Sequence, residues 1–88
     1  MGILGIFDLK IMNPDRIIFE GEISNLFVQG DTGEFEILPY HYPVLSLLRE
    51  GTLIIDWKYS LPVKKGVLRF FKNACVVLVE MHKEGRKG

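Results

Sequence analysis

The sequence has 88 residues, one cysteine, and eleven basic against eleven acidic side chains, so its formal net charge is zero. This length suits one domain with a modest core, and 48% hydrophobic residues are ample to pack it, which excludes a disordered chain. A balanced charge argues against nucleic acid as a partner, because phosphate binding normally needs a basic surface.

Turn-forming residues recur at short intervals, and the segments between them are too short for ordinary helices. The first segment alternates, with Phe7, Leu9 and Ile11 on one face and Asp8 and Lys10 on the other, which is typical of a half-buried strand. The strands predicted on this basis, in chain order, are 4–12, 16–29 with a bend, 34–38, 43–48, 51–59, 61–64, 66–72 and 74–82.

Many short strands with regular turns predict an all-β fold, a small antiparallel β-sandwich of about 8–10 short strands. We expect the sandwich to occupy residues 1–82, followed by a basic, flexible tail at 83–88. The segment Tyr42–Glu50 also fits helical spacing almost as well as strand spacing, so a helix there is the rival interpretation.

Two predicted strands carry an expectation about which side chains face the core. In 51–59, Leu53, Ile55, Trp57 and Tyr59 share one face, which we expect to point inward. In 66–72 we expect Phe71 to face the core, which leaves the neighbouring Phe70 outside.

The strand 74–82 is apolar on both faces, although a sandwich strand needs only one buried face. Cys75, Val77 and Val79 make one face, and Val76 and Leu78 lie on the other. An outer apolar patch in a protein often marks a partner. The alternative is a central strand that a loop or a bent sheet covers, and the sequence does not decide between the two.

The segment Gly30-Asp31-Thr32-Gly33 lies between two predicted strands. Glycine supplies positive φ at little steric cost, so this segment is expected to form a tight hairpin tip. Such a tip projects from the body of a domain and is well placed to touch a partner.

No residues combine into a convincing chemical site. His41 and His82 lie on different segments and lack the neighbours of a zinc site. Glu34 and Glu36 share a strand face, where a solvated surface is the better interpretation than acid–base chemistry. We therefore predict no catalytic residues, no cofactor and no metal, and the residues alone indicate a non-catalytic interaction module with an unknown partner.

The run from Phe19 to Leu45 adds a family likeness. It resembles the epsilon subunit of F-type ATP synthases, which shows a glycine hairpin, then Gly-Glu-hydrophobic-Gly-hydrophobic-hydrophobic-Pro, then His-Ala-Pro. The likeness continues through Leu47–Ile55 and Gly66-Val67-Leu68 to Ala74–Glu80, which covers nearly the whole chain. Glu36 and Tyr42 depart from the family pattern, in place of a usual glycine and a usual alanine, and Glu36 puts the local backbone conformation in question.

The resemblance implies a non-catalytic rotor subunit in the central stalk, which couples ion-driven rotation to ATP synthesis. By motif, the hairpin tip would contact the loops of the c-ring, and the segment after Pro39 would contact the gamma subunit. The expected c-ring contacts are Asp31, Thr32, Gly33 and Glu34, and the expected gamma contacts are His41, Tyr42, Pro43, Val76 and Leu78. Val76 and Leu78 would alternatively mediate self-association of the isolated subunit.

The resemblance also implies a location, as a peripheral protein held through its complex on the cytoplasmic side of a bacterial inner membrane. The family typically continues into a C-terminal helical hairpin that can restrain ATP hydrolysis. This sequence stops at Gly88, so we expect no such regulation from it. The alternative to the rotor subunit is a β-sandwich interaction or ligand-binding module with an unrelated partner.

Overall fold

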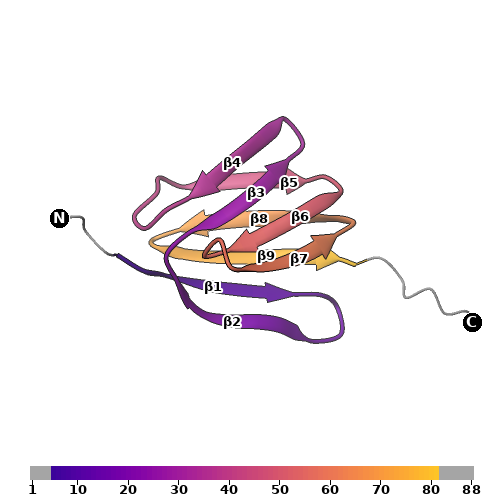
Figure 1. The fold of residues 1–88 in the computed structure, drawn as a ribbon, viewed down its shortest axis with the longest axis horizontal. Coiled ribbons are helices and arrows are strands. Elements are labelled where there is room, and N and C mark those ends of the chain that lie inside the picture. Colours follow the sequence, from indigo (N-terminus) through magenta and orange to yellow (C-terminus); the bar gives the residue numbers. More distant parts are fainter. Residues whose placement is uncertain (1–4, 82–88) are drawn as a thin grey trace, which may run out of the picture.

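The computed structural model describes residues 5–81, so the predicted tail at 83–88 and the outermost residues of the first and last predicted strands lie outside the described part (Figure 1). Nine strands and no helix occur within the described residues. They are β1 (Phe7–Met12), β2 (Ile17–Ile23), β3 (Leu26–Gly30), β4 (Gly33–Ile37), β5 (Val44–Leu48), β6 (Gly51–Ile55), β7 (Tyr59–Val63), β8 (Lys65–Phe71) and β9 (Ala74–Glu80).

The nine strands form one hydrogen-bonded sheet that folds into two layers. The strand order is β2-β1-β9-β8-β5-β3-β6-β7, with β4 paired to β3. β5 and β3 meet in register only at Leu48 and Gly30, so the sheet divides there into a β2-β1-β9-β8-β5 layer and a β4-β3-β6-β7 layer. Figure 1 shows β3 and β6 crossing at an angle over the strands β8 and β9. This arrangement confirms the predicted β-sandwich.

The core lies between the two layers and forms one cluster. One layer contributes residues such as Leu9, Leu68 and Val77, and the other contributes residues such as Val28 and Leu53, all of them buried. The alternating burial of β1, β8 and β9 follows from the period-two geometry of a strand with one buried face. The described residues contain no buried polar or charged residue.

One strand pairing differs from the antiparallel sandwich that the sequence predicts. β1 pairs in parallel with β9, with Leu9 opposite Cys75 and Ile11 opposite Val77. Tight hairpins force consecutive strands to be antiparallel, whereas β1 and β9 lie at opposite ends of the sequence and no short turn sets their relative direction. The other ladders are antiparallel.

The rival helix at Tyr42–Glu50 is wrong, because β5 occupies Val44–Leu48. β5 pairs with β8 along its whole length, from Val44 opposite Phe70 to Leu48 opposite Gly66. Pairing with a distant strand therefore decided a segment whose local pattern was ambiguous.

The predicted strand 51–59 breaks after Ile55. Asp56 and Trp57 both have positive φ, 56° and 52°, as the two central residues of a tight hairpin turn require. The inward face predicted for Trp57 and Tyr59 is therefore wrong: the chain reverses before them, and both side chains are 58% exposed. Trp57 instead packs on the Phe27 ring, with centroids 5.3 Å apart.

The expected orientation of the two adjacent phenylalanines is also wrong. Phe70 is 1% exposed and packs edge-on against Phe7, with ring centroids 5.4 Å apart, whereas Phe71 is 45% exposed. The alternation of β8 decides this, because Leu68 is buried and Arg69 is exposed, so the next buried position is 70.

The bend in the predicted strand 16–29 falls at Ser24 and Asn25, between β2 and β3. The Asp56 carboxylate accepts hydrogen bonds from the backbone N–H groups of Ser24, at 2.6 Å, and Asn25, at 3.1 Å. The backbone N–H of Asp56 in turn donates to the Asn25 carbonyl oxygen at 2.9 Å. The β6–β7 turn thus fixes the place where the chain passes from one layer to the other.

Candidate protein-binding surfaces

The hairpin tip at Asp31–Thr32 joins β3 to β4, as the sequence predicts. Gly30 and Gly33 form the last pair of the ladder, and Gly33 has a φ of 142°. Asp31, Thr32 and Glu34 are exposed and Gly33 is half-buried. The Asp31 backbone N–H donates to the Leu47 carbonyl oxygen at 3.0 Å, so the tip is tethered to β5.

Gln29 gives the hairpin its second support, a role that the sequence did not reveal. Its side-chain carbonyl oxygen accepts from the Thr52 backbone N–H at 2.7 Å, and its amide nitrogen donates to the Glu34 carboxylate at 3.3 Å. The side chain lies directly over Gly51, where a Cβ atom would collide with it. Glycine at 51 therefore lets Gln29 tie the tip to β6.

The loop between β4 and β5 carries the other predicted segment, His41-Tyr42-Pro43. His41 is half-buried, Tyr42 and Pro43 are exposed, and the His41 ring lies 4.3 Å from the Tyr42 ring and 5.9 Å from the Phe70 ring. The His41 backbone N–H donates to the Leu38 carbonyl oxygen at 3.1 Å, which closes the turn. The loop is thus a structured surface that rests on the edge of the core.

Asn73, in the β8–β9 turn, holds this loop in place through side-chain hydrogen bonds. Its side-chain oxygen accepts from the Tyr40 backbone N–H at 2.7 Å, and its side-chain nitrogen donates to the Ile6 carbonyl oxygen at 2.9 Å. Asn73 has a φ of 61°, in a region that asparagine tolerates better than most residues. One amide therefore joins three segments that are distant in sequence.

The tip and the loop lie at opposite ends of β4. The tip precedes Gly33 and the loop follows Ile37, and Figure 1 shows the two connections on opposite sides of the molecule. The predicted contact residues of the tip and of the loop thus form two surfaces, separated by one strand.

Val76 and Leu78 both point outward from β9, with 36% and 51% of their surface exposed, although β9 is a central strand. The predicted outer apolar patch is therefore confirmed within the described residues. The register assigns them to different rows across the sheet. Val76 is flanked by Arg69 and Lys10, and Leu78 by Val67 and Met12.

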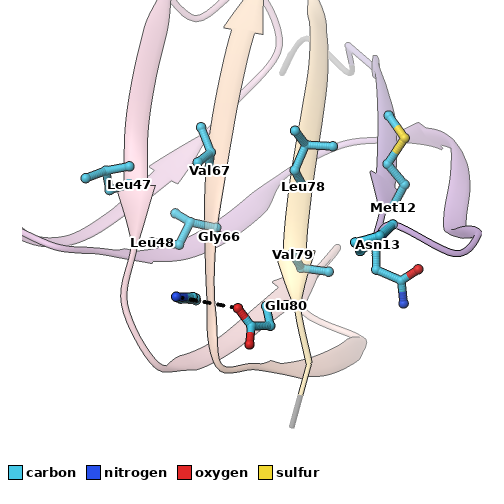
Figure 2. A pocket seen from close by; sticks show the side chains of 11 residues that line it. Met12, Asn13, Leu47, Leu48, Gly66, Val67, Leu78, Val79 and Glu80 are labelled. Atoms are coloured by element: carbon cyan, nitrogen blue, oxygen red, sulfur yellow. Dashed lines mark ion pairs between the residues drawn. The ribbon is translucent and has the colours of Figure 1, made fainter. Parts of the chain in front are cut away.

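The row that contains Leu78 lies beside an open hollow of about 550 Å³. Figure 2 shows Leu47, Val67, Leu78 and Met12 around it, with Glu80 at the rim. Leu47 and Met12 were not singled out from the sequence, because the row becomes visible only when the register of four strands is known. Gly66 also lines the hollow, and there a Cβ would lie 2.5 Å from the Leu78 carbonyl oxygen.

Glu36, the departure from the family pattern, lies in regular strand and does not have a positive φ. Its carboxylate accepts from the Asn25 side-chain nitrogen at 2.7 Å, so the glutamate adds a link between β4 and the bend after β2. The doubt about the local backbone is thereby removed.

Reactive groups do not gather at any of these surfaces. Residues 5–81 contain no group of three or more His, Cys, Asp or Glu side chains that could hold a metal ion. Burial raises the pKa of the Cys75 thiol to about 12, which keeps it protonated and unreactive at neutral pH. His82 lies outside the described residues. No helix in the described part is long and apolar enough to cross a membrane.

The described residues form a small β-sandwich that leaves aliphatic and aromatic side chains exposed on its surface. The comparisons with known proteins give its family. Residues 6–84 match the family model described as "ATP synthase, Delta/Epsilon chain, beta-sandwich domain", so the chain belongs to that family.

Relatives named ATP synthase epsilon chain agree with this assignment. The protein of Nitratiruptor sp. is 34% identical over 76 residues, which are 82% of this chain and 59% of that protein. The protein of Leptospira borgpetersenii is 38% identical over 76 residues, 83% of this chain and 60% of that protein. The chain therefore spans about three fifths of the length of these relatives.

Solved structures share the fold. A chain of the Euglena gracilis mitochondrial ATP synthase (OSCP/F1/c-ring) superposes with a TM-score of 0.76 at 14% identity, over 89% of this chain and 53% of that chain. A chain from the Tetrahymena thermophila mitochondrial ATP synthase central stalk and c-ring gives 0.70 at 15% identity, over 85% and 63%. These likenesses establish the β-sandwich architecture.

Proposed function

We propose that this chain is a non-catalytic rotor subunit of the central stalk of an F-type ATP synthase, where it couples ion-driven rotation to ATP synthesis. The hairpin tip at Asp31–Glu34 binds the loops of the c-ring. The surface at His41–Pro43, together with Val76 and Leu78, binds the gamma subunit. Its association with the membrane runs through the complex, on the cytoplasmic side of a bacterial inner membrane.

The observation that carries the proposal is the placement of two structured, exposed segments at opposite ends of β4. A subunit between a ring and a stalk needs two separate contact surfaces. Gln29 and the Asp31–Leu47 bond hold the first surface, and Asn73 holds the second. Prearranged surfaces lose little conformational entropy on binding, which favours assembly with large partners. Membership of the ATP synthase Delta/Epsilon family supports the gamma subunit and the c-ring as those partners.

Site-specific cross-linking in the assembled complex tests the proposal. A short thiol-reactive cross-linker is placed at Asp31→Cys, at Tyr42→Cys, or at the control Ser60→Cys, an exposed position on β7. The native Cys75 does not compete, because it is buried and its raised pKa suppresses the thiolate.

We expect the D31C variant to cross-link to the c subunit and the Y42C variant to cross-link to gamma, with little product from S60C. Capture of neither subunit at positions 31 and 42, in a complex that contains this chain, would contradict the proposed contacts. Failure of the chain to co-purify with gamma and the c-ring at all would favour the alternative of a sandwich module with an unrelated partner.

A further inference from the structure

We infer that a cationic aromatic patch beside the β4–β5 loop binds an acidic, partly apolar segment of the gamma subunit. The patch consists of Leu45, Arg69, Phe71 and Lys72. The inference rests on the proposed function and adds the chemistry of the partner surface, together with the residues that recognise it.

The patch brings residues of β5, β8 and the β8–β9 turn onto one outer face, beside Val76 of β9. Leu45 of β5 lies opposite Arg69 of β8, which in turn lies opposite Val76 of β9. Phe71 follows two residues after Arg69 on the same face of the strand. The Arg69 guanidinium lies 5.7 Å from the centre of the Phe71 ring and the Lys72 ammonium lies 5.4 Å from it. One exposed ring therefore holds two cations close together.

Both cations lack an acidic partner among residues 5–81. The ion pairs in this part of the chain join Lys10 to Glu20 and join Lys64 and Lys65 to Glu80. Two uncompensated like charges on an otherwise apolar surface raise the local positive potential, although the net charge of the whole chain is zero. Charge complementarity then points to a partner segment that carries carboxylates.

The acidic residues on the same outer face lie away from the patch. Asp8 lies opposite Ala74, which separates it from Phe71, and Glu22 lies beyond Asp8 on β2. Neither carboxylate makes an ion pair with Arg69 or Lys72. The positive potential of the patch is thus left for a partner to neutralise.

A shallow hollow of about 330 Å³ accompanies the charges. It is lined by Pro43, Val44, Leu45, Arg69, Phe70 and Phe71, most of which are apolar. Such a hollow accepts an apolar side chain beside the two cations, so the partner segment should carry an apolar residue next to its carboxylates. Aromatic and arginine side chains around a small apolar hollow are the composition of energetically dominant interface positions.

The patch is also held in place before binding. Lys72 and Asn73 form a turn with φ values of 50° and 61°, and the Asn73 side chain fixes the backbone of Tyr40 in the adjacent loop. Asn73 is therefore a positioning residue, because it ties the turn that carries Lys72 to the loop that carries Tyr42. Preorganisation lowers the entropic cost of binding.

The test measures the affinity of the full chain for recombinant gamma subunit from the same organism, alone and assembled with the catalytic head. The double variant Arg69→Gln/Lys72→Gln removes both charges, and Phe71→Ala removes the ring. The matched control is Lys58→Gln, because Lys58 is also exposed and lies 5.7 Å from an aromatic ring, that of Tyr59, but outside the patch.

We expect the double variant and F71A each to weaken binding by about ten-fold or more, and K58Q to leave the affinity within about two-fold. Raising the NaCl concentration from 50 to 300 mM should weaken wild-type binding several-fold and should have much less effect on the double variant, because salt screens exposed charges. Asn73→Gly keeps a residue that tolerates positive φ, so this variant should fold and still bind more weakly, with its salt dependence unchanged.

Two outcomes overturn the inference, and they can be told apart. If wild-type chain binds gamma but R69Q/K72Q binds equally well, the patch is not the interface and the proposed function stands. If wild-type chain does not bind gamma in either form, the proposed function and the inference fall together. Circular dichroism of every variant at the binding temperature confirms that a loss of affinity reflects the surface and not unfolding.

Discussion

Replacing Phe70 by alanine should come close to unfolding the domain, whereas the same change at the adjacent Phe71 should have little effect on stability. Phe70 is 1% exposed and packs against the rings of Phe7 and His41, while Phe71 is 45% exposed. Truncation of a fully buried phenylalanine costs about 3–5 kcal/mol through lost burial and the cavity left behind. Truncation of the half-exposed neighbour should cost less than about 1 kcal/mol, because nearly half of its surface already contacts water.

These magnitudes are large relative to the stability of a small domain, which is about 5–15 kcal/mol in total. A loss of 3–5 kcal/mol lowers the midpoint of thermal unfolding by roughly 12–40 °C at this chain length. Urea denaturation at 15 °C, followed by circular dichroism, measures both variants on the same scale. Phe70→Leu, which keeps most of the volume, should lose less than about 1.5 kcal/mol and serves as the folded reference.

The comparison is decisive because the two positions are adjacent and chemically identical. Equal destabilisation by F70A and F71A, or a larger loss for F71A, would refute the burial assignment and with it the outward placement of the cationic aromatic patch.

Three further predictions concern single positions. The free energy of unfolding should fall more steeply above about pH 9 in the wild type than in Cys75→Ala, because burial raises the pKa of the Cys75 thiol in the folded state to about 12. The stabilisation is complete below the unfolded-state pKa of the thiol and is lost as the pH rises towards the folded-state pKa. The expected difference in slope is about 1.4 kcal/mol per pH unit, and equal slopes would show that the thiol is not shielded. Gly66→Ala should lower the free energy of unfolding, measured in urea, by about 1–3 kcal/mol, because the new Cβ would lie 2.5 Å from the Leu78 carbonyl oxygen. The control Gly21→Ala, whose Cβ would meet only the Phe19 ring at 3.5 Å, should change it by no more than about 0.5 kcal/mol, and an equally small change for G66A would contradict the close approach at Gly66. Asp56→Ala should lower the free energy of unfolding by about 1–3 kcal/mol, because it removes the acceptor for the backbone N–H groups of Ser24 and Asn25. Asp56→Asn retains an acceptor and should lower it by less than half as much, and equal losses would show that the charge of Asp56 matters and not its hydrogen bonds.

The sandwich could be predicted from the sequence because strand periodicity and turn chemistry agree along most of the chain. The exposed pair Val76 and Leu78 could also be recognised, since β9 is apolar at successive positions and a sandwich strand buries only one face. The hairpin tip followed from its two glycines, because their backbone freedom is a local property.

Other features depend on contacts between distant segments, which local pattern does not contain. The segment at Val44–Leu48 is apolar at four of five positions, and its pairing with β8 was needed to choose strand over helix. The turn at Asp56-Trp57 lacks glycine, so its positive φ values had no local signal, and Trp57 was placed in the core. The orientation of Phe70 did have a signal, because Arg69 must point outward and period two then sends residue 70 inward.

For the same reason, the candidate surfaces could be predicted from the sequence only in part. Asp31–Glu34 and His41–Pro43 are continuous segments and could be named from a family motif. Leu45, Arg69 and Phe71 come together only through the register of β5 with β8, so no contiguous motif marks the cationic aromatic patch.

β4 sets the distance between the two proposed partners in a way that restricts how the family can vary. Five extended residues, Gly33–Ile37, hold the tip and the loop about 17 Å apart, at roughly 3.4 Å per residue. Insertion or deletion of one residue would turn Glu34 and Glu36 inward and Phe35 and Ile37 outward, because strand side chains alternate. The spacing between the proposed c-ring contact and the proposed gamma contact can therefore change only in steps of two residues, about 7 Å, so β4 does not allow fine adjustment of that spacing.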